Sequence, residues 1–319
     1  MRIADTVPWS IGADIGFSNT RVAKVANGAP IKVLRFPTDV KGGPGGVLEQ
    51  ISAGVRELRA NEPTPPAGLG VGIAGQCDVR TGMVRCGPNL WWKDEPLERE
   101  LSEATGLRTV LRNDVVMATV GEWRHGAGQG ARNVAAMFFG TGIGGGAVVE
   151  GRLLEGATGC GGHFGHISVD LDGPTCACGR KGCVEAFAGG WAVARRAQEA
   201  MRGEPAISGP LRSLSAGRPE TVDCRMVAEA AHRGDRFALA IRDDMAAAIS
   251  SAVATVINVL NPERFMLGGT VLNGFPELYD MVVEGALRSC LGPAREGLTI
   301  VPASLGDLSG AVGAATMVL

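Results

Sequence analysis

Residues 133–150 read NVAAMFFGTGIGGGAVVE, two apolar segments separated by the glycine-rich run GTGIGGG. Apolar runs bounded by glycine predict two strands joined by a turn. Successive backbone amides in such a turn can surround a phosphate group, and the Thr141 hydroxyl adds a donor. The Gly-Lys-Ser/Thr ending of a P-loop is absent from the run. We therefore predict a phosphate-binding hairpin of another kind, with its amides at residues 140–146.

A second hairpin is predicted near the N-terminus. Residues 10–25 read SIGADIGFSNTRVAKV, in which two β-rich segments flank a short polar turn with Asp14 and Gly16 at its tip. Taken alone, this pattern fits an ordinary hairpin equally well. Two hairpins of this kind in one chain of 319 residues predict two copies of one structural unit.

Residues 159–185 read GCGGHFGHISVDLDGPTCACGRKGCVE. His166, Cys176, Cys178 and Cys183 have the spacing of four ligands to one tetrahedral zinc ion. The glycines interleaved with the cysteines let the backbone curl so that three thiolates converge. The alternative is three unrelated buried thiols and a surface histidine. The interleaved glycines favour the metal site, because a core element rarely contains them.

Composition limits the class of protein. The formal net charge of −2 gives no electrostatic indication of nucleic acid or of a membrane surface. The first residues lack the apolar segment of a signal peptide. Residues 245–260 form the longest apolar run, but serines and an asparagine interrupt it, which favours a buried helix over a membrane span. Eight cysteines, three of them assigned to metal, fit a reducing compartment. We expect a cytoplasmic α/β protein.

The remaining patterns predict further elements. In chain order they are a loop at 37–46, a helix at 47–59, strands at 69–74 and 108–112, a helix at 115–125, a helix at 184–201, a loop at 203–221, helices at 226–231 and 236–260, a strand after Asn261-Pro262, a turn at Gly268 and Gly269, and a final helix at 311–318.

Several of these segments, in this order, resemble the ROK family (repressors, uncharacterised frames and sugar kinases). GGHFGHI followed by CACGRKGCVE is similar to the family pattern GExGH and CxCGxxGCxE, and DIGFSN is similar to DxGGTN. The pattern of strand, Asn113-Asp114 and helix also belongs to the family. Three positions differ: His163 replaces a glutamate, Phe17 a glycine and Ser18 a threonine.

The resemblance implies a two-lobed actin-like ATPase (ribonuclease H-like) fold of class α/β, with duplicated βββαβα units around an interdomain cleft. Residues 1–113 would form a small lobe, joined by a C-terminal helix near 302–319. Residues 114–301 would form a large lobe with the zinc motif. The family also implies a homodimer.

The implied activity is ATP- and Mg²⁺-dependent phosphorylation of O6 of a hexose, with Asp114 as the general base. An acid at this position also offsets a helix dipole, so a structural role stays open. Asn89 is either a sugar ligand or a turn residue after Pro88. The implied substrate residues are Gly75, Asn89, Asn113, Asp114, His163, His166 and Glu185.

The resemblance also implies how nucleotide and metals are held. Asp14 would hold Mg²⁺ directly or through water, and His166 would both bind zinc and face the sugar, since its ring has two nitrogens. The implied nucleotide-binding residues are Asp14, Gly16, Ser18, Asn19, Gly140, Thr141, Gly142, Gly144, Gly268 and Gly269.

The substrate stays open at this stage. A glutamate accepts hydrogen bonds at two oxygens, whereas imidazole makes one bond at each nitrogen, so His163 changes what the site recognises. An amino sugar such as 3-amino-3-deoxyglucose, or a C7-cyclitol, is an alternative to glucose. A non-catalytic sugar-sensing regulator is also open. A DNA-binding repressor is not expected, because too few residues precede the first hairpin for a helix-turn-helix.

Overall fold

The computed structural model describes residues 7–203 and 209–319, which form two compact units. Unit 1 comprises residues 1–134 as far as they are described, Gly146–Gly162 and Ala303–Leu319; unit 2 comprises Ala135–Gly145 and His163–Pro302. What the sequence predicts for residues 1–6 and 204–208 lies outside the described residues. The division into lobes at residue 113 stays a prediction.

Two five-stranded sheets have the same strand order. The first is β3-β2-β1-β4-β8 and the second is β11-β10-β9-β12-β13, so each has three consecutive strands followed by two that add beyond the first of them. This repeat confirms the α/β class and the duplication. The strands of the two sheets are β1 (Trp9–Ile15), β2 (Asn19–Ala26), β3 (Ala29–Pro37), β4 (Leu69–Ile73), β8 (Thr109–Asn113), β9 (Val134–Phe139), β10 (Ile143–Val149), β11 (Arg152–Leu153), β12 (Arg264–Gly268) and β13 (Thr299–Pro302).

A small antiparallel sheet, β5-β6-β7, is inserted after β4, where the sequence analysis predicted no strands. Its strands are β5 (Gln76–Asp78), β6 (Met83–Gly87) and β7 (Trp92–Glu95). The α-helices are α1 (Gly43–Arg59), α2 (Leu97–Thr105), α3 (Asp114–His125), α4 (Val184–Ala188), α5 (Gly190–Gly203), α6 (Pro210–Leu214), α7 (Cys224–His232), α8 (Arg236–Leu260), α9 (Thr270–Gly274), α10 (Pro276–Ser289) and α11 (Ser309–Thr316). Single 3₁₀ turns are η1 (Phe164–His166), η2 (Pro219–Thr221), η3 (Pro293–Arg295) and η4 (Gly306–Leu308).

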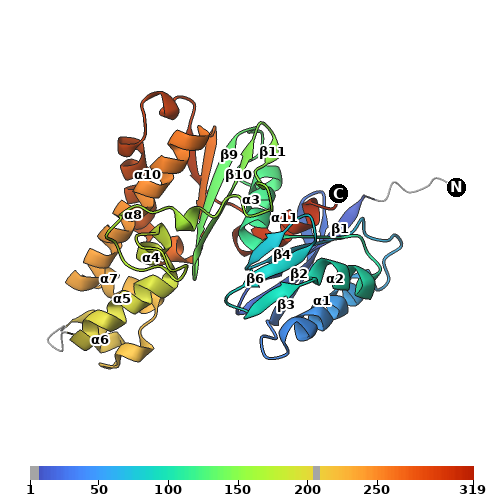
Figure 1. Ribbon diagram of the computed structural model, residues 1–319, viewed down its shortest axis with the longest axis horizontal. Coiled ribbons are helices and arrows are strands. Elements are labelled where there is room, and N and C mark those ends of the chain that lie inside the picture. The colour runs from blue at the N-terminus through green and yellow to red at the C-terminus, as the bar shows by residue number, and fades with distance from the viewer. Residues whose placement is uncertain (1–6, 204–208) are drawn as a thin grey trace. The chain divides into compact units, whose positions relative to one another are not determined.

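The first sheet is covered on both faces by helices (Figure 1). Alternate residues of β1, such as Ile11, pack with α1 and α2 in one core. On the other face, α11 lies close to the strands, because a Cβ at Gly12 or Gly70 would come within 2 Å of an α11 carbonyl oxygen. The Ser10 hydroxyl donates to the Ala315 carbonyl, 2.8 Å away. Asp14 belongs to this second face.

The predicted strands and helices are mostly confirmed, and α8 has the bounds predicted for it. This helix is long and apolar enough to cross a membrane by length and composition, but just over half of its most apolar stretch is buried inside the protein. It packs against α10, α7 and α4 as a core helix of unit 2.

Four predictions were wrong in detail. Helix α1 begins at Gly43, inside the predicted loop, because Pro44 suits a first turn. The helix predicted at 184–201 breaks at Gly189 into α4 and α5. The run GTGIGGG is not all turn, since β10 begins at Ile143. The predicted loop at 203–221 contains α6, which buries Leu211.

Candidate functional site

The carboxyl ends of three parallel strands bring two carboxylates to one edge of the first sheet. Strands β1, β4 and β8 are mutually parallel in that order, with Asp14 opposite Gly72, and Gly72 opposite Arg112. Asp114 follows β8 directly as the first residue of α3. Since Gly72 has no side chain, Asp114 can pack beside it; a Cβ there would lie 3.2 Å from the Asp114 Cα.

Both carboxyl groups hold their protons more tightly than usual. Burial raises the pKa of Asp14 to about 7; the charge of Asp114 adds to this rise, and Arg21 opposes it. Burial likewise raises the pKa of Asp114 to about 6, against the opposing hydrogen bond from the Val115 N–H. Perturbed carboxyl groups that titrate near neutral pH are typical of acid–base sites.

Arg21 is a partner that the sequence analysis missed. Its Nη1 lies 3.3 Å from Asp14 Oδ2, and its Nε lies 3.4 Å from Asp307 Oδ2. The hairpin register places Arg21 directly opposite Asp14 on β2. Pairing the two predicted strands about the tip of the hairpin would therefore have identified Arg21 as the partner of Asp14.

Asn113 joins the second carboxylate to a predicted substrate segment. Its Oδ1 accepts from the backbone N–H groups of Val115 and Val116, which caps α3. Its Nδ2 donates to the Gly75 carbonyl over 3.1 Å. Gly75 and Asn113, two predicted substrate residues, are thus in direct contact beside Asp114.

Asn89 lies exposed in the turn between β6 and β7. This turn is close to Gly75, because a Cβ at Gly75 would lie 2.7 Å from the Cys86 carbonyl oxygen and 3.2 Å from the Gly87 Cα. Unit 1 therefore brings Asn89, Gly75, Asn113 and Asp114 into one series of neighbouring segments.

The tip of the first hairpin is held by β3 and the residue after it. The Gly16 N–H donates to the Asn19 carbonyl, and the Thr38 hydroxyl donates to the Gly16 carbonyl over 2.7 Å. The Thr38 N–H donates to the Ser18 carbonyl. The side chains of Ser18 and Asn19 are left at the surface.

In unit 2 the second glycine turn is short and anchored. The Gly140 N–H donates to the Gly142 carbonyl, while Gly190 and Trp191, at the start of α5, donate to the carbonyls of Gly140 and Thr141. Gly144 lies outside the turn, in β10.

The Gly268-Gly269 segment meets this turn. Gly269 has a φ of +109°, and a Cβ there would lie 2.3 Å from the Phe139 carbonyl oxygen. The structure therefore joins the two predicted nucleotide segments of unit 2, while the first hairpin belongs to unit 1.

The four predicted zinc ligands come together. The ligand atoms of His166, Cys176, Cys178 and Cys183 all lie within 4.8 Å of one another. Cys178 Sγ and Cys183 Sγ are 3.7 Å apart, and Cys176 Sγ is 3.8 Å from His166 Nδ1. Zn–S bonds of about 2.3 Å in a tetrahedron require sulfurs close to ~3.8 Å apart. The donor set and its spacing fit zinc.

Glu185 connects the segment of the candidate zinc ligands, residues 163–185, to the glycine turn at residues 140–142. Its Oε2 accepts from the Ile143 N–H over 2.8 Å, and its Oε1 lies 3.4 Å from the donor Trp191 Nε1. The His163 ring centroid is 6.3 Å from that of His166. Burial lowers the pKa of His163; His166 adds to this effect and Glu185 opposes it, which leaves a neutral imidazole at neutral pH.

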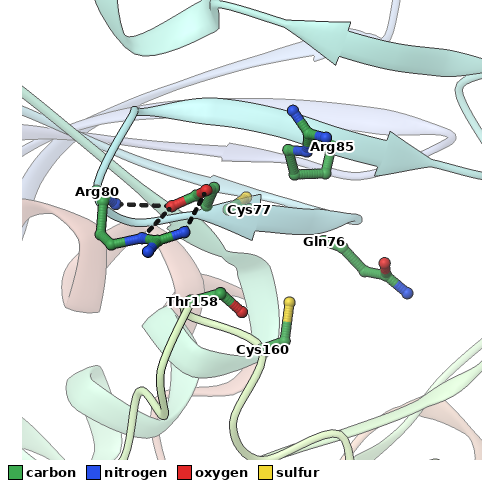
Figure 2. A pocket seen from close by; sticks show the side chains of 7 residues that line it. Gln76, Cys77, Arg80, Arg85, Thr158 and Cys160 are labelled. Atoms are coloured by element: carbon green, nitrogen blue, oxygen red, sulfur yellow. Dashed lines mark hydrogen bonds and ion pairs between the residues drawn. The ribbon is translucent and has the colours of Figure 1, made fainter.

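A cavity of about 390 Å³ lies in unit 1, next to Gly75 in the chain. Arg80 on one side of the cavity is paired with Asp78. Figure 2 shows Thr158 and Cys160 entering from a separate loop. Gln76, Cys77 and Arg85 complete its lining. Arg85 is paired with Asp94, so both guanidinium charges are compensated. None of the predicted site residues lines this cavity.

Comparison with known proteins identifies the family of this chain. Residues 11–319 match the model of the ROK family. The glucokinase of Thermotoga maritima is 36% identical over 314 residues, which cover 97% of this chain and 96% of the glucokinase. The kanosamine kinase of Amycolatopsis mediterranei is 27% identical, with 97% and 96% covered.

The fold agrees as well. The crystal structure of a ROK family glucokinase from Streptomyces griseus in complex with glucose and AMPPNP superposes with a TM-score of 0.82, at 30% identity, covering 97% of this chain and 98% of that one. The fold is the actin-like ATPase fold of these kinases. With its duplicated sheets, its paired carboxylates and a family match over nearly the whole chain, this protein belongs to the ROK family.

Proposed function

We propose that this protein is an ATP-dependent sugar kinase that transfers the γ-phosphoryl group of ATP to the primary hydroxyl, O6, of a hexose or hexose-like substrate. The observation that carries the proposal is the pair of partly buried carboxyl groups, Asp14 and Asp114, at the carboxyl edge of the first sheet. The glucokinase relatives support the substrate class.

Asp114 acts as the general base. With a pKa near 6 it is largely ionised at neutral pH, yet more basic than an ordinary carboxylate. It accepts the O6 proton as O6 forms a bond to the γ-phosphorus. The bond from that phosphorus to its bridging oxygen breaks, and ADP leaves with the electron pair.

Asp14 supplies the hard carboxylate oxygen that Mg²⁺ prefers. Mg²⁺, when bound, neutralises charge on the phosphates. Arg21 fixes the Asp14 side chain from one side. The other proposed nucleotide ligands are Gly16, Ser18, Asn19, Gly140, Thr141, Gly142, Gly144, Gly268 and Gly269. Zinc at His166 and the three cysteines would stabilise the segment that presents His163 and Glu185.

A second candidate substrate is an amino sugar such as 3-amino-3-deoxyglucose. The specific observation is His163, a neutral imidazole where relatives are expected to have a glutamate. The kanosamine kinase relative supports this candidate. The proposed sugar ligands are Gly75, Asn89, Asn113, His163, His166 and Glu185. A cyclitol substrate, a homodimer and a cytoplasmic location remain part of the proposal.

The test is ADP release with a panel of glucose, mannose, 3-amino-3-deoxyglucose and a C7-cyclitol. Asp114→Asn should lower kcat by ~10²–10⁴-fold while sugar affinity stays near that of the wild type. Glu57→Gln, which removes an exposed carboxylate paired with Lys32 in the same unit, is the matched control. Sugar binding without ADP release by the wild type would favour a sugar-sensing regulator. Near-normal kcat in Asp114→Asn would place the base elsewhere.

A further inference from the structure

Two exposed aromatic side chains, Phe17 and Trp91, meet beside the proposed substrate residues. Their ring centroids are 6.3 Å apart with an interplanar angle of 82°, an edge-to-face contact. Phe17 is 44% exposed and Trp91 is 77% exposed. Both belong to unit 1. Neighbouring exposed aromatic rings present apolar area to water, and such area is available to a ligand.

The Phe17–Trp91 contact completes a series of neighbouring segments that leads from one carboxylate, Asp114, to the other, Asp14. From Asp114 the series passes through Asn113 to Gly75, and from Gly75 to the β6–β7 turn. That turn contains Asn89 and Trp91. Phe17 then leads through Gly16 back to Asp14. The Phe17–Trp91 contact is the one apolar step in this series.

The backbone at Trp91 has a conformation that is unfavourable for a bulky side chain. Its φ is +55°, in the left-handed region that disfavours every residue with a bulky side chain. Its neighbours Leu90 and Trp92 are 2% and 4% exposed, so they anchor the turn and direct Trp91 outward. Strain of this kind persists where the surrounding structure enforces it, and it gathers at ligand sites.

We infer that Phe17 and Trp91 form an apolar wall that packs against the C–H face of the sugar-like ring, and that this wall helps determine which ring is accepted. The inference rests on the proposed function for the identity of the ligand. Aromatic rings pack well on the apolar faces of pyranose and cyclitol rings, and Trp91 lies in the same turn as Asn89, a proposed sugar ligand. Phe17 and Trp91 are specificity-determining residues and take no part in proton transfer.

The test measures sugar binding without nucleotide, by calorimetric titration with glucose and with 3-amino-3-deoxyglucose. Trp91→Gly and Phe17→Gly should each raise the Kd of the better sugar by ~10-fold, the effect of losing one aromatic contact with its buried area. Trp91→Phe should stay close to the wild type. Because the two rings act as one wall, the double variant should bind about as weakly as Trp91→Gly, not a further tenfold more weakly.

Two controls separate binding from folding. Ile31→Ala removes another exposed apolar side chain of unit 1, 60% exposed on β3, and should leave the Kd unchanged. Trp91→Gly should keep or raise the Tm, because glycine adopts a φ of +55° without strain. The affinity of Trp91→Gly for AMPPNP should not change.

Equal sugar affinity in the wild type and Trp91→Gly would overturn the inference. So would a Tm that falls in step with affinity, since that would make the pair merely structural. Absence of sugar binding to the wild type would overturn it as well. If Trp91→Gly weakens sugar binding but the wild type releases no ADP, the apolar wall is supported and the kinase activity is contradicted. If the wild type releases ADP but Trp91→Gly leaves the Kd of the sugar unchanged, the kinase activity is supported and the apolar wall is contradicted.

Discussion

Asp14 and Asp114 determine how the protein should respond to pH. Their pKa values are raised to about 7 and about 6, chiefly by burial, and because like charges interact the two titrate as a pair. We expect kcat/KM for the best sugar, at saturating MgATP, to rise from pH 5 to pH 8 with apparent pKa values in this range. A profile already flat at pH 5 would mean that the base titrates like an ordinary carboxylate.

The raised pKa values of Asp14 and Asp114 also affect stability. Their effect on the free energy of unfolding changes with pH in the opposite direction from that of a salt-bridged acid, whose pKa is lowered. An unfolded aspartate has a pKa of 3.8, so between about pH 4 and pH 7 the folded chain binds protons that the unfolded chain has lost. The contribution of both carboxyl groups to the free energy of unfolding is therefore greatest at low pH and declines as pH rises through the folded pKa values. Thermal melts of the protein at pH 5 and at pH 8 measure this effect on stability.

In the proposed site, His163 is one residue that we expect to influence substrate choice. Its neutral ring offers one acceptor, whereas a glutamate would offer two oxygens to vicinal hydroxyls. We expect His163→Glu to raise kcat/KM for glucose relative to 3-amino-3-deoxyglucose, because a paired polar site discriminates strongly against a ligand that lacks the partner. If the wild type already prefers glucose and His163→Glu leaves the ratio of the two kcat/KM values unchanged, residue 163 does not affect substrate choice, and a water takes the place of the second acceptor.

Among the elements, we expect residues 163–185, which contain the four candidate zinc ligands, to depend on a bound metal for their conformation. Cys176 and Cys183 are buried, Cys178 is exposed, and few regular elements hold the chain between η1 and α4. Purified protein should contain about one zinc per chain by elemental analysis. Cys178→Ser should lose the metal and weaken sugar binding through Glu185. Cys160→Ser, also an exposed thiol, should keep it; a fully active, metal-free protein would contradict the site.

Elements with strong local signals could be predicted from the sequence. Helix α8 has Asp235 as its N-cap, accepting from two backbone N–H groups, and it ends at Asn261 in the left-handed conformation before a proline. The first hairpin followed from alternation about a polar tip. The break at Gly189 was missed although the Gly189-Gly190 pair was a local signal for it. Its position also coincides with a contact to the Gly140 turn, far away in sequence.

The site divides in the same way. The zinc ligands were predicted from a short motif, and the structure brings their four ligand atoms together. Asp114 was predicted as the base from the family resemblance of its segment, and that role stays a prediction. Arg21 required the strand register, and the Phe17–Trp91 contact joins residues 74 positions apart on separate segments. Such contacts depend on how the small sheet packs within unit 1, about which local patterns contain no information.

On the scale of the whole molecule, two units with separate cores make separate thermal transitions expected. The four zinc ligands all lie in unit 2. In unit 1, α11 crosses α3 so closely that a Cβ at Gly313 would lie 1.7 Å from the Met117 carbonyl oxygen. These two features allow each unit to be perturbed by itself.

We expect scanning calorimetry to resolve two transitions, each moved by one perturbation. Cys178→Ser or a chelator should lower the transition of unit 2, because metal binding free energy is folding free energy for its ligands. Gly313→Ala should lower that of unit 1, since overpacking against backbone costs about 1–3 kcal/mol. Gly45→Ala, where a Cβ in α1 meets nothing within 4 Å, should not lower it. A single transition moved equally by both perturbations would mean that the duplicated units unfold as one cooperative block, and that the division seen in their packing has no counterpart in their stability.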